Sequence, residues 1–230
     1  MTGPCPPDAG DIVVIADGTS AGVLSQVIAD AFADLAVSRW LIPDQAARHR
    51  IFPGYFRLYV EHALAGGIVC TTPGQDAVAL WLPAGEEPAP PSEGYDERLA
   101  ALTGPWIDRF RAFDQALEVR HPAGFAHHHL AILAVRPARQ GRGLGSALLR
   151  AHHAALDRDG IAAYLEASDL RTRRLYRAHG YADCGAPLAF PGAVMYPMAR
   201  QPRAGQPSRK ALPGGLAGST GPGSAPGGAR

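Results

Sequence analysis

The chain has 230 residues, of which 47% are hydrophobic and 19% charged, and its formal net charge at pH 7 is +1. This composition suits a globular protein with a sizeable core, and so small a charge gives no electrostatic reason to expect a nucleic-acid partner. No stretch is apolar for long enough to cross a membrane, and the N-terminal residues lack the basic and apolar segments of a signal peptide. The three cysteines show no metal-ligand spacing, which favours a reducing compartment. We therefore expect a cytoplasmic protein with no nucleic-acid and no membrane partner.

The two ends of the sequence differ in composition from the rest. Residues 1–10 are rich in Pro and Gly, and residues 201–230 hold eight Gly, five Pro and only two large apolar residues. Segments of this kind bury too little apolar surface to offset the entropy lost on ordering. We expect disordered ends at 1–10 and 201–230, on either side of one domain over 11–200.

Apolar periodicity predicts the elements of the first half. A strand is expected over 11–15, and a helix over 21–35 where apolar residues recur at helical spacing. Asp44 is expected to cap a second helix, which the pair Pro53-Gly54 should interrupt, so that a separate helix runs on to about Leu64. The patterns that follow predict strands over 67–72 and 77–82, a loop over 83–93, and one or two helices over 97–119.

The second half alternates more regularly between strands and helices. The patterns predict strands over 128–135, 163–167, 181–183 and 194–198, a helix over 143–158, and a helix over 170–179 that ends at Gly180. Elements in this order indicate an α/β (α+β) domain that is built around one sheet.

A glycine-rich loop joins the strand that ends at Val135 to the following helix. Gln140, Gly143 and Gly145 form the pattern Gln-x-x-Gly-x-Gly, with Arg139 and Arg142 beside it. Glycines let a ligand approach the backbone closely, and a helix N-terminus attracts an anion, so the loop suits a phosphate. The loop fits neither the dinucleotide fingerprint nor a Walker loop, because the required third glycine and the Gly-Lys pair are missing. The alternative is a tight turn with incidental arginines.

The residues around this loop carry a family resemblance. The segments Leu130–Pro137 and Arg139–Gly145, together with Leu165-Glu-Ala-Ser168 and Leu175-Tyr-Arg-Ala-His-Gly-Tyr181, strongly resemble the GNAT superfamily of acyl-CoA-dependent N-acetyltransferases. The resemblance extends over about 11–200, is most specific in 127–182, and looks closest to enzymes of the puromycin N-acetyltransferase kind. The segments that suggest this group are Ala31-Phe-Ala-Asp34, Arg39-Trp40, Pro43-Asp44 and Ala79-Leu-Trp-Leu-Pro83. The resemblance implies the GNAT fold, a mixed and strongly twisted central sheet flanked by helices.

The resemblance also implies acetyl-CoA as the co-substrate and assigns residues to it. Tyr176 would protonate the leaving thiolate, a role that a phenol of pKa about 10 can fill. Many relatives have Asn at the position of Thr172, so the contact of Thr172 with the co-substrate would be weaker or pass through water. The pantetheine arm would pair with the backbone of Leu133, Ala134 and Val135, and the pyrophosphate would bind the backbone amides of Gln140, Gly141, Arg142, Gly143, Leu144, Gly145 and Ser146.

The acceptor amine needs a group that takes its proton. Glu166 is the best carboxylate by family context, although a structural acid fits equally well. Strand alternation puts His127 and His129 on one face and His128 on the other, where one of them is either a proton relay or a polar residue at the entrance of the strand. No metal site is expected. Trp40 and Trp81 either line the acceptor pocket or fill the core, as do the weaker pocket candidates Tyr55, Phe56, Tyr59 and Phe110.

The sequence thus predicts an acetyl-CoA-dependent N-acetyltransferase, a monomer or a homodimer. No cysteine lies in the motif segments to carry the acyl group, so direct attack by the amine is expected. The expected acceptor is a small-molecule amine, with an antibiotic or its precursor as one class. The alternatives are a protein acetyltransferase that acts on lysines or N-termini, and a non-enzymatic acyl-CoA-binding regulatory module, against which Tyr176 argues.

Overall fold

The computed structural model describes residues 13–85 and 94–203. The expected disordered segment 1–10, all but the first three residues of the expected disordered segment 201–230, and most of the expected loop over 83–93 lie outside these residues. Within them, no helix combines the length and the apolarity that a membrane span requires.

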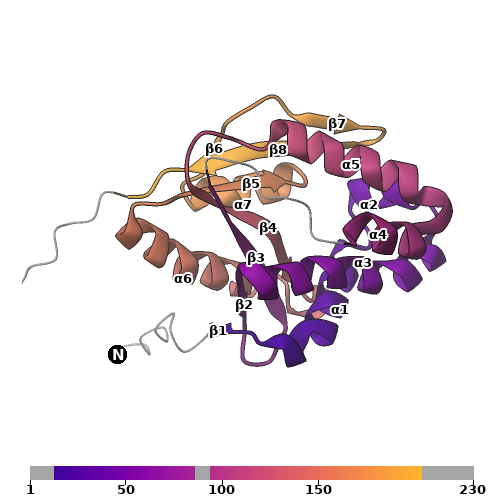
Figure 1. Ribbon diagram of the computed structural model, residues 1–230. Helices are drawn as coiled ribbons and strands as arrows, with labels where there is room; N and C mark the ends of the chain where they lie inside the picture. The colour runs from indigo at the N-terminus through magenta and orange to yellow at the C-terminus, as the bar shows by residue number, and fades with distance from the viewer. Residues whose placement is uncertain (1–12, 86–93, 204–230) are drawn as a thin grey trace, which may run out of the picture.

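One mixed sheet organises the chain, with the strand order β1-β2-β3-β4-β5-β8-β6 and with β7 paired to β8 (Figure 1). The pairs are antiparallel except β4 and β5, which run parallel. This mixed sheet with flanking helices confirms the predicted fold class. The strands are β1 Val14–Ile15, β2 Ile68–Thr71, β3 Ala77–Ala84, β4 His127–Val135, β5 Ala162–Ala167, β6 Ala182–Asp183, β7 Leu188–Phe190 and β8 Ala193–Arg200.

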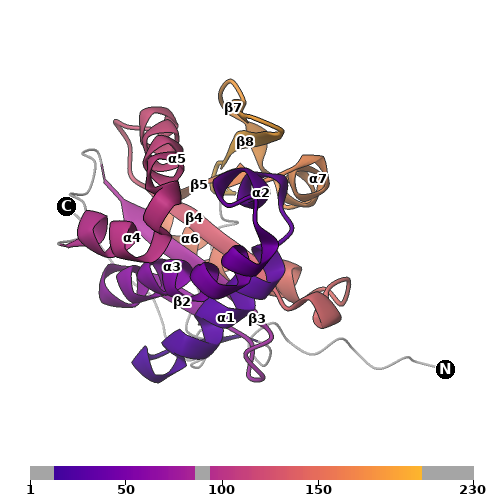
Figure 2. The ribbon, with the colours of Figure 1, turned by 90° about the vertical axis from the view of Figure 1, so that its right-hand side faces the viewer.

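The helices form two cores, one on each face of the sheet. Alternation along β3 points Val78 and Leu80 into the core with α1–α5, and Ala79 and Trp81 into the core under α6. Figures 1 and 2 show α1, α3, α4 and α5 gathered on the side of the sheet away from α6. The helices are α1 Ala21–Phe32, α2 Ala36–Leu41, α3 Gln45–Gly66, α4 Tyr95–Thr103, α5 Ile107–Arg120, α6 Leu144–Asp159 and α7 Leu170–Ala178.

The predicted break at Pro53-Gly54 is wrong, because α3 runs without interruption through both residues. Asp44 caps this helix as expected, its side chain accepting from the backbone N–H of Ala47 at 2.6 Å. A proline inside a helix costs about 3 kcal/mol, and here the flanking aromatic residues, among them Phe52 and Tyr55, are buried in the core and offset that cost. Helix α4 approaches at Gly54, where a Cβ would lie 2.7 Å from a methyl group of Leu102 and would require that side chain to shift.

Other boundaries differ less from the expectation. The helix predicted over 21–35 ends at Phe32 and is followed by the short α2, which the sequence reading missed along with β7. The region 97–119 holds two helices, α4 and α5, separated by a 3-10 turn over Gly104–Trp106. Gly180 follows α7 as predicted, with a φ of +89° that favours glycine.

The two parallel strands diverge after three residue pairs. In the described residues, β4 pairs with β5 only where His127–His129 face Ala162–Tyr164, whereas β4 continues to Val135 and pairs with β3 along its whole length. The edge of β4 from Leu130 to Val135 therefore faces away from β3 without a strand beside it. This opening in the sheet positions the site.

Candidate active site

A cavity of about 520 Å³ lies at the opening between β4 and β5. One side, the loop wall, consists of lining residues from β4, the glycine loop, the end of β5 and α7. The opposite side, the helical wall, comes from α1, α2, α3, α5 and β8. The helical wall consists of Ala31, Phe32, Leu35, Val37, Ser38, Leu41, Tyr55, Phe56, Tyr59, Phe113, Leu117 and Met195.

The glycine loop has the backbone geometry that an anion site needs. Gly141 and Gly143 have φ values of +76° and +81°, in the left-handed region that favours glycine, and open space lies where a Cβ would be. Gly143 is the N-cap of α6 and has no side chain to bond the first helical N–H groups. These groups have no partner within the helix. The loop can therefore offer several N–H donors to a phosphate at the positive end of the helix.

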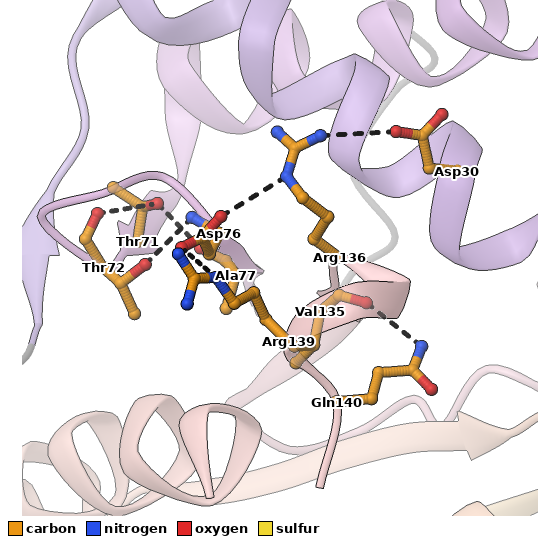
Figure 3. A network of polar contacts seen from close by, with 9 residues as sticks. All are labelled: Asp30, Thr71, Thr72, Asp76, Ala77, Val135, Arg136, Arg139 and Gln140. Atoms are coloured by element: carbon orange, nitrogen blue, oxygen red, sulfur yellow. Dashed lines mark hydrogen bonds and ion pairs between the residues drawn. The ribbon is translucent and has the colours of Figure 1, made fainter. Parts of the chain in front are cut away.

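Two arginines before the loop are held by one carboxylate (Figure 3). The Nε atoms of Arg136 and Arg139 lie 3.4 Å and 3.2 Å from the two oxygens of Asp76, and a terminal nitrogen of Arg136 lies 3.5 Å from Asp30. Arg139 lines the cavity, but the side chain of Arg142 does not. The backbone carbonyl of Val135 accepts a hydrogen bond from the side-chain amide of Gln140 at 3.1 Å. The network thus ties the start of the loop to α1 and to the turn before β3.

His129 and Glu166 form a hydrogen-bonded pair in the cavity lining. Nε2 of His129 lies 2.9 Å from a carboxylate oxygen of Glu166, whose side chain is only 5% exposed. Burial alone would raise the pKa of Glu166, but the charge and hydrogen bond of His129 outweigh it and leave the pKa below its usual value. The second oxygen of Glu166 has no hydrogen-bond partner in the described part of the chain. The pair can therefore hold and pass a proton.

Two more histidines lie behind this pair. His121 at the end of α5 faces Nε2 of His127 at 3.1 Å, and burial lowers the pKa of His121 to about 4. The predicted alternation along β4 is confirmed, because His128 lies on the other face and contacts His152 at 2.9 Å. Ligand atoms of His121, His129 and Glu166 lie within 4.8 Å of one another, an arrangement that could also hold a metal ion. Within this group the hydrogen bond joins His129 to Glu166, whereas His121 is bonded to His127.

Tyr176 lines the same cavity from α7. Its side chain is buried, and burial together with the charge of Asp169 raises its pKa, so the hydroxyl keeps its proton at neutral pH. Thr172 also lines the cavity, but its hydroxyl already belongs to the capping box that Asp169 forms at the start of α7. Thr172 therefore has a structural role that the sequence reading did not foresee.

The predicted cofactor and catalytic residues come together, whereas most predicted acceptor residues do not. Of the four acceptor candidates only His129 lines the cavity. Trp81 is fully buried against His152 on the far side of the sheet, His127 is buried, and Trp40 packs on Phe190. The structure thus corrects the prediction that these three residues contact the acceptor. In each case the ring packs against neighbouring side chains instead of facing the cavity.

The helical wall contains the weaker candidates and others that the sequence reading missed. Tyr55, Phe56 and Tyr59 line the cavity, but Phe110 is completely buried in the core. The missed residues include Phe32, Leu35, Phe113 and Leu117. No motif marks them, because they are ordinary apolar positions of amphipathic helices.

Comparison with known proteins now places the fold. Residues 112–183 match a family model described as acetyltransferase (GNAT) domain. A solved structure from Corynebacterium glutamicum, of a histone acetyltransferase and related acetyltransferase, is 24% identical with a TM-score of 0.64, over 85% of this chain and 98% of its own. Arylalkylamine N-acetyltransferase 2 of Aedes aegypti is 15% identical with a TM-score of 0.58, over 83% and 98% of the two chains.

An agmatine N-acetyltransferase variant is also 15% identical, with a TM-score of 0.51 over 83% of this chain and 98% of its own. No protein with a curated description matches the chain by sequence. At these identities the likeness establishes a shared fold, so the sheet and its helices have the GNAT fold, and the part of the chain from α5 to β6 matches the family's own pattern.

Proposed function

We propose that this acyltransferase moves an acetyl group from acetyl-CoA directly to the amine of a small molecule. One observation carries the proposal: a single cavity joins the glycine loop, the open edge of β4, the His129–Glu166 pair and Tyr176. Among solved structures of the same fold are arylalkylamine and agmatine N-acetyltransferases, whose names describe small amines as acceptors.

Acetyl-CoA fits the loop wall as a substrate. The N–H groups from Gln140 to Ser146 would bind its pyrophosphate, because the left-handed glycines leave space beside the helix N-terminus. The open edge of β4 at Leu133–Val135 would pair with the amides of the pantetheine arm, as an added strand would. The hydrogen bond from Gln140 to the carbonyl of Val135 would be exchanged for a bond to the arm.

The amine attacks only when it is neutral, so it must lose a proton. Glu166 accepts the Nε2 proton of His129, which leaves Nδ1 of the ring as a proton acceptor. We assign proton removal to this pair, with Glu166 fixing the tautomer and stabilising the charged ring. The 2.9 Å contact between the two side chains supports a base in which the carboxylate and the histidine act together.

The amine nitrogen forms a bond to the thioester carbonyl carbon, and the carbon–sulfur bond then breaks. Tyr176 gives its proton to the departing thiolate, and the proton taken from the amine returns to the enzyme's hydroxyl through solvent. The raised pKa of Tyr176 keeps the hydroxyl protonated before each turnover. Acetylated amine and free CoA are the products.

Substitution of Tyr176 by Phe tests this assignment. We expect kcat to fall about 100-fold or more, as general acids typically contribute, with the affinity for acetyl-CoA unchanged. Tyr181→Phe is the matched control, because Tyr181 packs against Tyr176 and does not line the cavity. Release of CoA thiol measures turnover, and calorimetry measures binding. Wild-type turnover in Tyr176→Phe would refute the acid role.

The finer proposals rest on the sequence. We propose one domain over residues 11–200, a cytoplasmic location, a monomeric or homodimeric state, and an antibiotic or antibiotic precursor of the puromycin kind among the acceptors. Turnover with aminonucleosides would support the last of these. Acetyl-lysine on a co-incubated protein would instead favour a protein acetyltransferase. Binding of acetyl-CoA with no turnover on any amine or protein would favour a regulatory module.

A further inference from the structure

The helical wall of the cavity has no charged side chain among its described residues. Its members are aliphatic or aromatic except for the hydroxyls of Ser38, Tyr55 and Tyr59. Phe56 and Phe113 are buried, whereas Leu35 and Leu117 are partly exposed. The wall comes from four helices and one strand that all belong to the same core. An acceptor held against this wall therefore meets apolar surface.

The two tyrosine hydroxyls in the wall are bonded to each other. The hydroxyl oxygens of Tyr55 and Tyr59 lie 3.0 Å apart, and the hydroxyl of Tyr95 donates to Asp114 at 2.9 Å. Burial raises the pKa of Asp114 to about 6, and Asp114 does not line the cavity. Asp114 is thus already bonded to Tyr95 and lies outside the lining that a ligand would contact.

The charged lining residues lie on the loop wall. Glu166 and His129 stand beside the reacting centre, and Arg139 is paired with Asp76 at the glycine loop. Asp169 accepts the N–H of Thr172 and caps α7. Among the described lining residues, negative charge for an ammonium group is therefore available only at the loop wall.

From this distribution of charge we infer that the acceptor is a monoamine with an uncharged apolar body, aromatic or aliphatic. The inference rests on the proposed function and names its substrate class. The amino group would face His129 and Glu166, and the body would lie against the helical wall. A second ammonium group, as in a diamine or a basic peptide, would lie against a helical wall whose described residues offer no counter-ion, which is strongly unfavourable.

A matched pair of acceptors tests the inference on the unmodified protein. Hexylamine and 1,6-diaminohexane have the same length and the same reactive group, and differ by the second ammonium. We expect kcat/KM, corrected for the fraction of neutral amine, to be about 100-fold higher for hexylamine. 2-Phenylethylamine should also be accepted. Equal or better turnover of the diamine or of a lysine peptide would overturn the inference and leave the acetyltransferase function standing.

A charge placed in the wall should shift this preference. Leu117→Glu introduces a carboxylate at a lining position of α5, and Val119→Glu introduces the same charge at an exposed position of the same helix outside the lining. We expect Leu117→Glu to narrow the monoamine-to-diamine ratio about tenfold or more, and Val119→Glu to leave it unchanged. Thermal melting shows whether each variant folds. An unchanged ratio in a folded Leu117→Glu would contradict the inference.

Different experimental results would contradict the proposed function and the proposed substrate class. Acetyl-CoA binding without turnover on any amine would defeat both the function and the substrate class. Turnover that favours doubly charged amines would defeat the substrate class alone. If Leu117→Glu does not fold, the comparison of hexylamine with 1,6-diaminohexane on the wild-type protein still decides.

Discussion

The two walls of the cavity are built in different ways. The loop wall comes largely from one stretch of chain, from β4 to α7, and it presents backbone groups and the polar side chains that would move protons. The helical wall draws on residues between Ala31 and Met195 and presents apolar side chains. A backbone site recognises a constant donor whatever the surrounding side chains are. A wall of side chains can change its ligand with each substitution, so we propose that the helical wall selects the acceptor.

The largest expected effect is a loss of turnover in variants of the loop wall that still bind acetyl-CoA. We expect Glu166→Gln and His129→Asn each to lower kcat/KM about 100-fold. The double variant should lose little more than either single one, because the two residues act as one proton-accepting unit. The acetyl-CoA affinity of each variant, measured by calorimetry, should stay near that of the wild type. Losses that add in the double variant would show that the residues act separately.

A pair of glycines at opposite ends of α6 tests the backbone part of the same wall. Gly143 and Gly160 both have left-handed φ values, and both have open space at the Cβ position. Substitution by Ala should cost each variant about 1–2 kcal/mol of stability. Only Gly143→Ala should raise the KM for acetyl-CoA, by about tenfold. A similar rise in Gly160→Ala would show that strain in the helix, rather than the phosphate site, controls binding.

The sequence could predict the loop wall because its signals are local. Gln140, Gly143 and Tyr176 stand in short motifs whose spacing carries the chemistry, and the structure brings them into one cavity. The pairing of His129 with Glu166 joins residues 37 positions apart, so no local pattern could show it. Alternation along β4 could at least assign His129 to the correct face.

The sequence could not predict the helical wall for the opposite reason. Leu35, Phe113 and Leu117 have the spacing of ordinary core residues, and only the tertiary arrangement decides which of them face a cavity. For the two tryptophans the sequence left both a pocket and a core position open, because a large aromatic residue suits either. The sequence predicted two helices where the structure has the single helix α3. The free-energy cost of Pro53 inside a helix can be seen in the sequence, but the burial of the residues beside it cannot.

Arg139 and Arg142 allow a further comparison, between an arginine that lines the cavity and one that does not. Arg139 lines the cavity and is partly neutralised by Asp76, whereas the Arg142 side chain lies outside the lining. We expect Arg139→Gln to raise the KM for acetyl-CoA about threefold at low salt, with less effect at high salt, because the pair is half-exposed and screened. Arg142→Gln should change the KM by less than about twofold, since only its backbone N–H is needed. The reverse order would assign the phosphate contact to Arg142.

The smallest effect on activity should come from histidines behind the loop wall, which we expect to govern acid sensitivity. Burial lowers the pKa of His152 to about 4 and that of His153 to about 3, from about 6.5 in the unfolded chain. The unfolded state then binds more protons below pH 6.5, so stability falls as the pH drops, by up to about 1.4 kcal/mol per pH unit for each histidine. Asp114 acts in the opposite sense, because its pKa is raised to about 6.

The difference between variant and wild type therefore isolates the two histidines. Urea unfolding at pH 7.5 and 5.5 should show a smaller loss of stability in His152→Gln and in His153→Gln than in the wild type, by about 1 kcal/mol each. The KM for acetyl-CoA at pH 7.5 should stay the same, because neither side chain lines the cavity. An equal loss in variant and wild type would mean that the acid sensitivity originates elsewhere. His121, behind the His129–Glu166 pair, is then the next residue to test, since its pKa is also lowered to about 4.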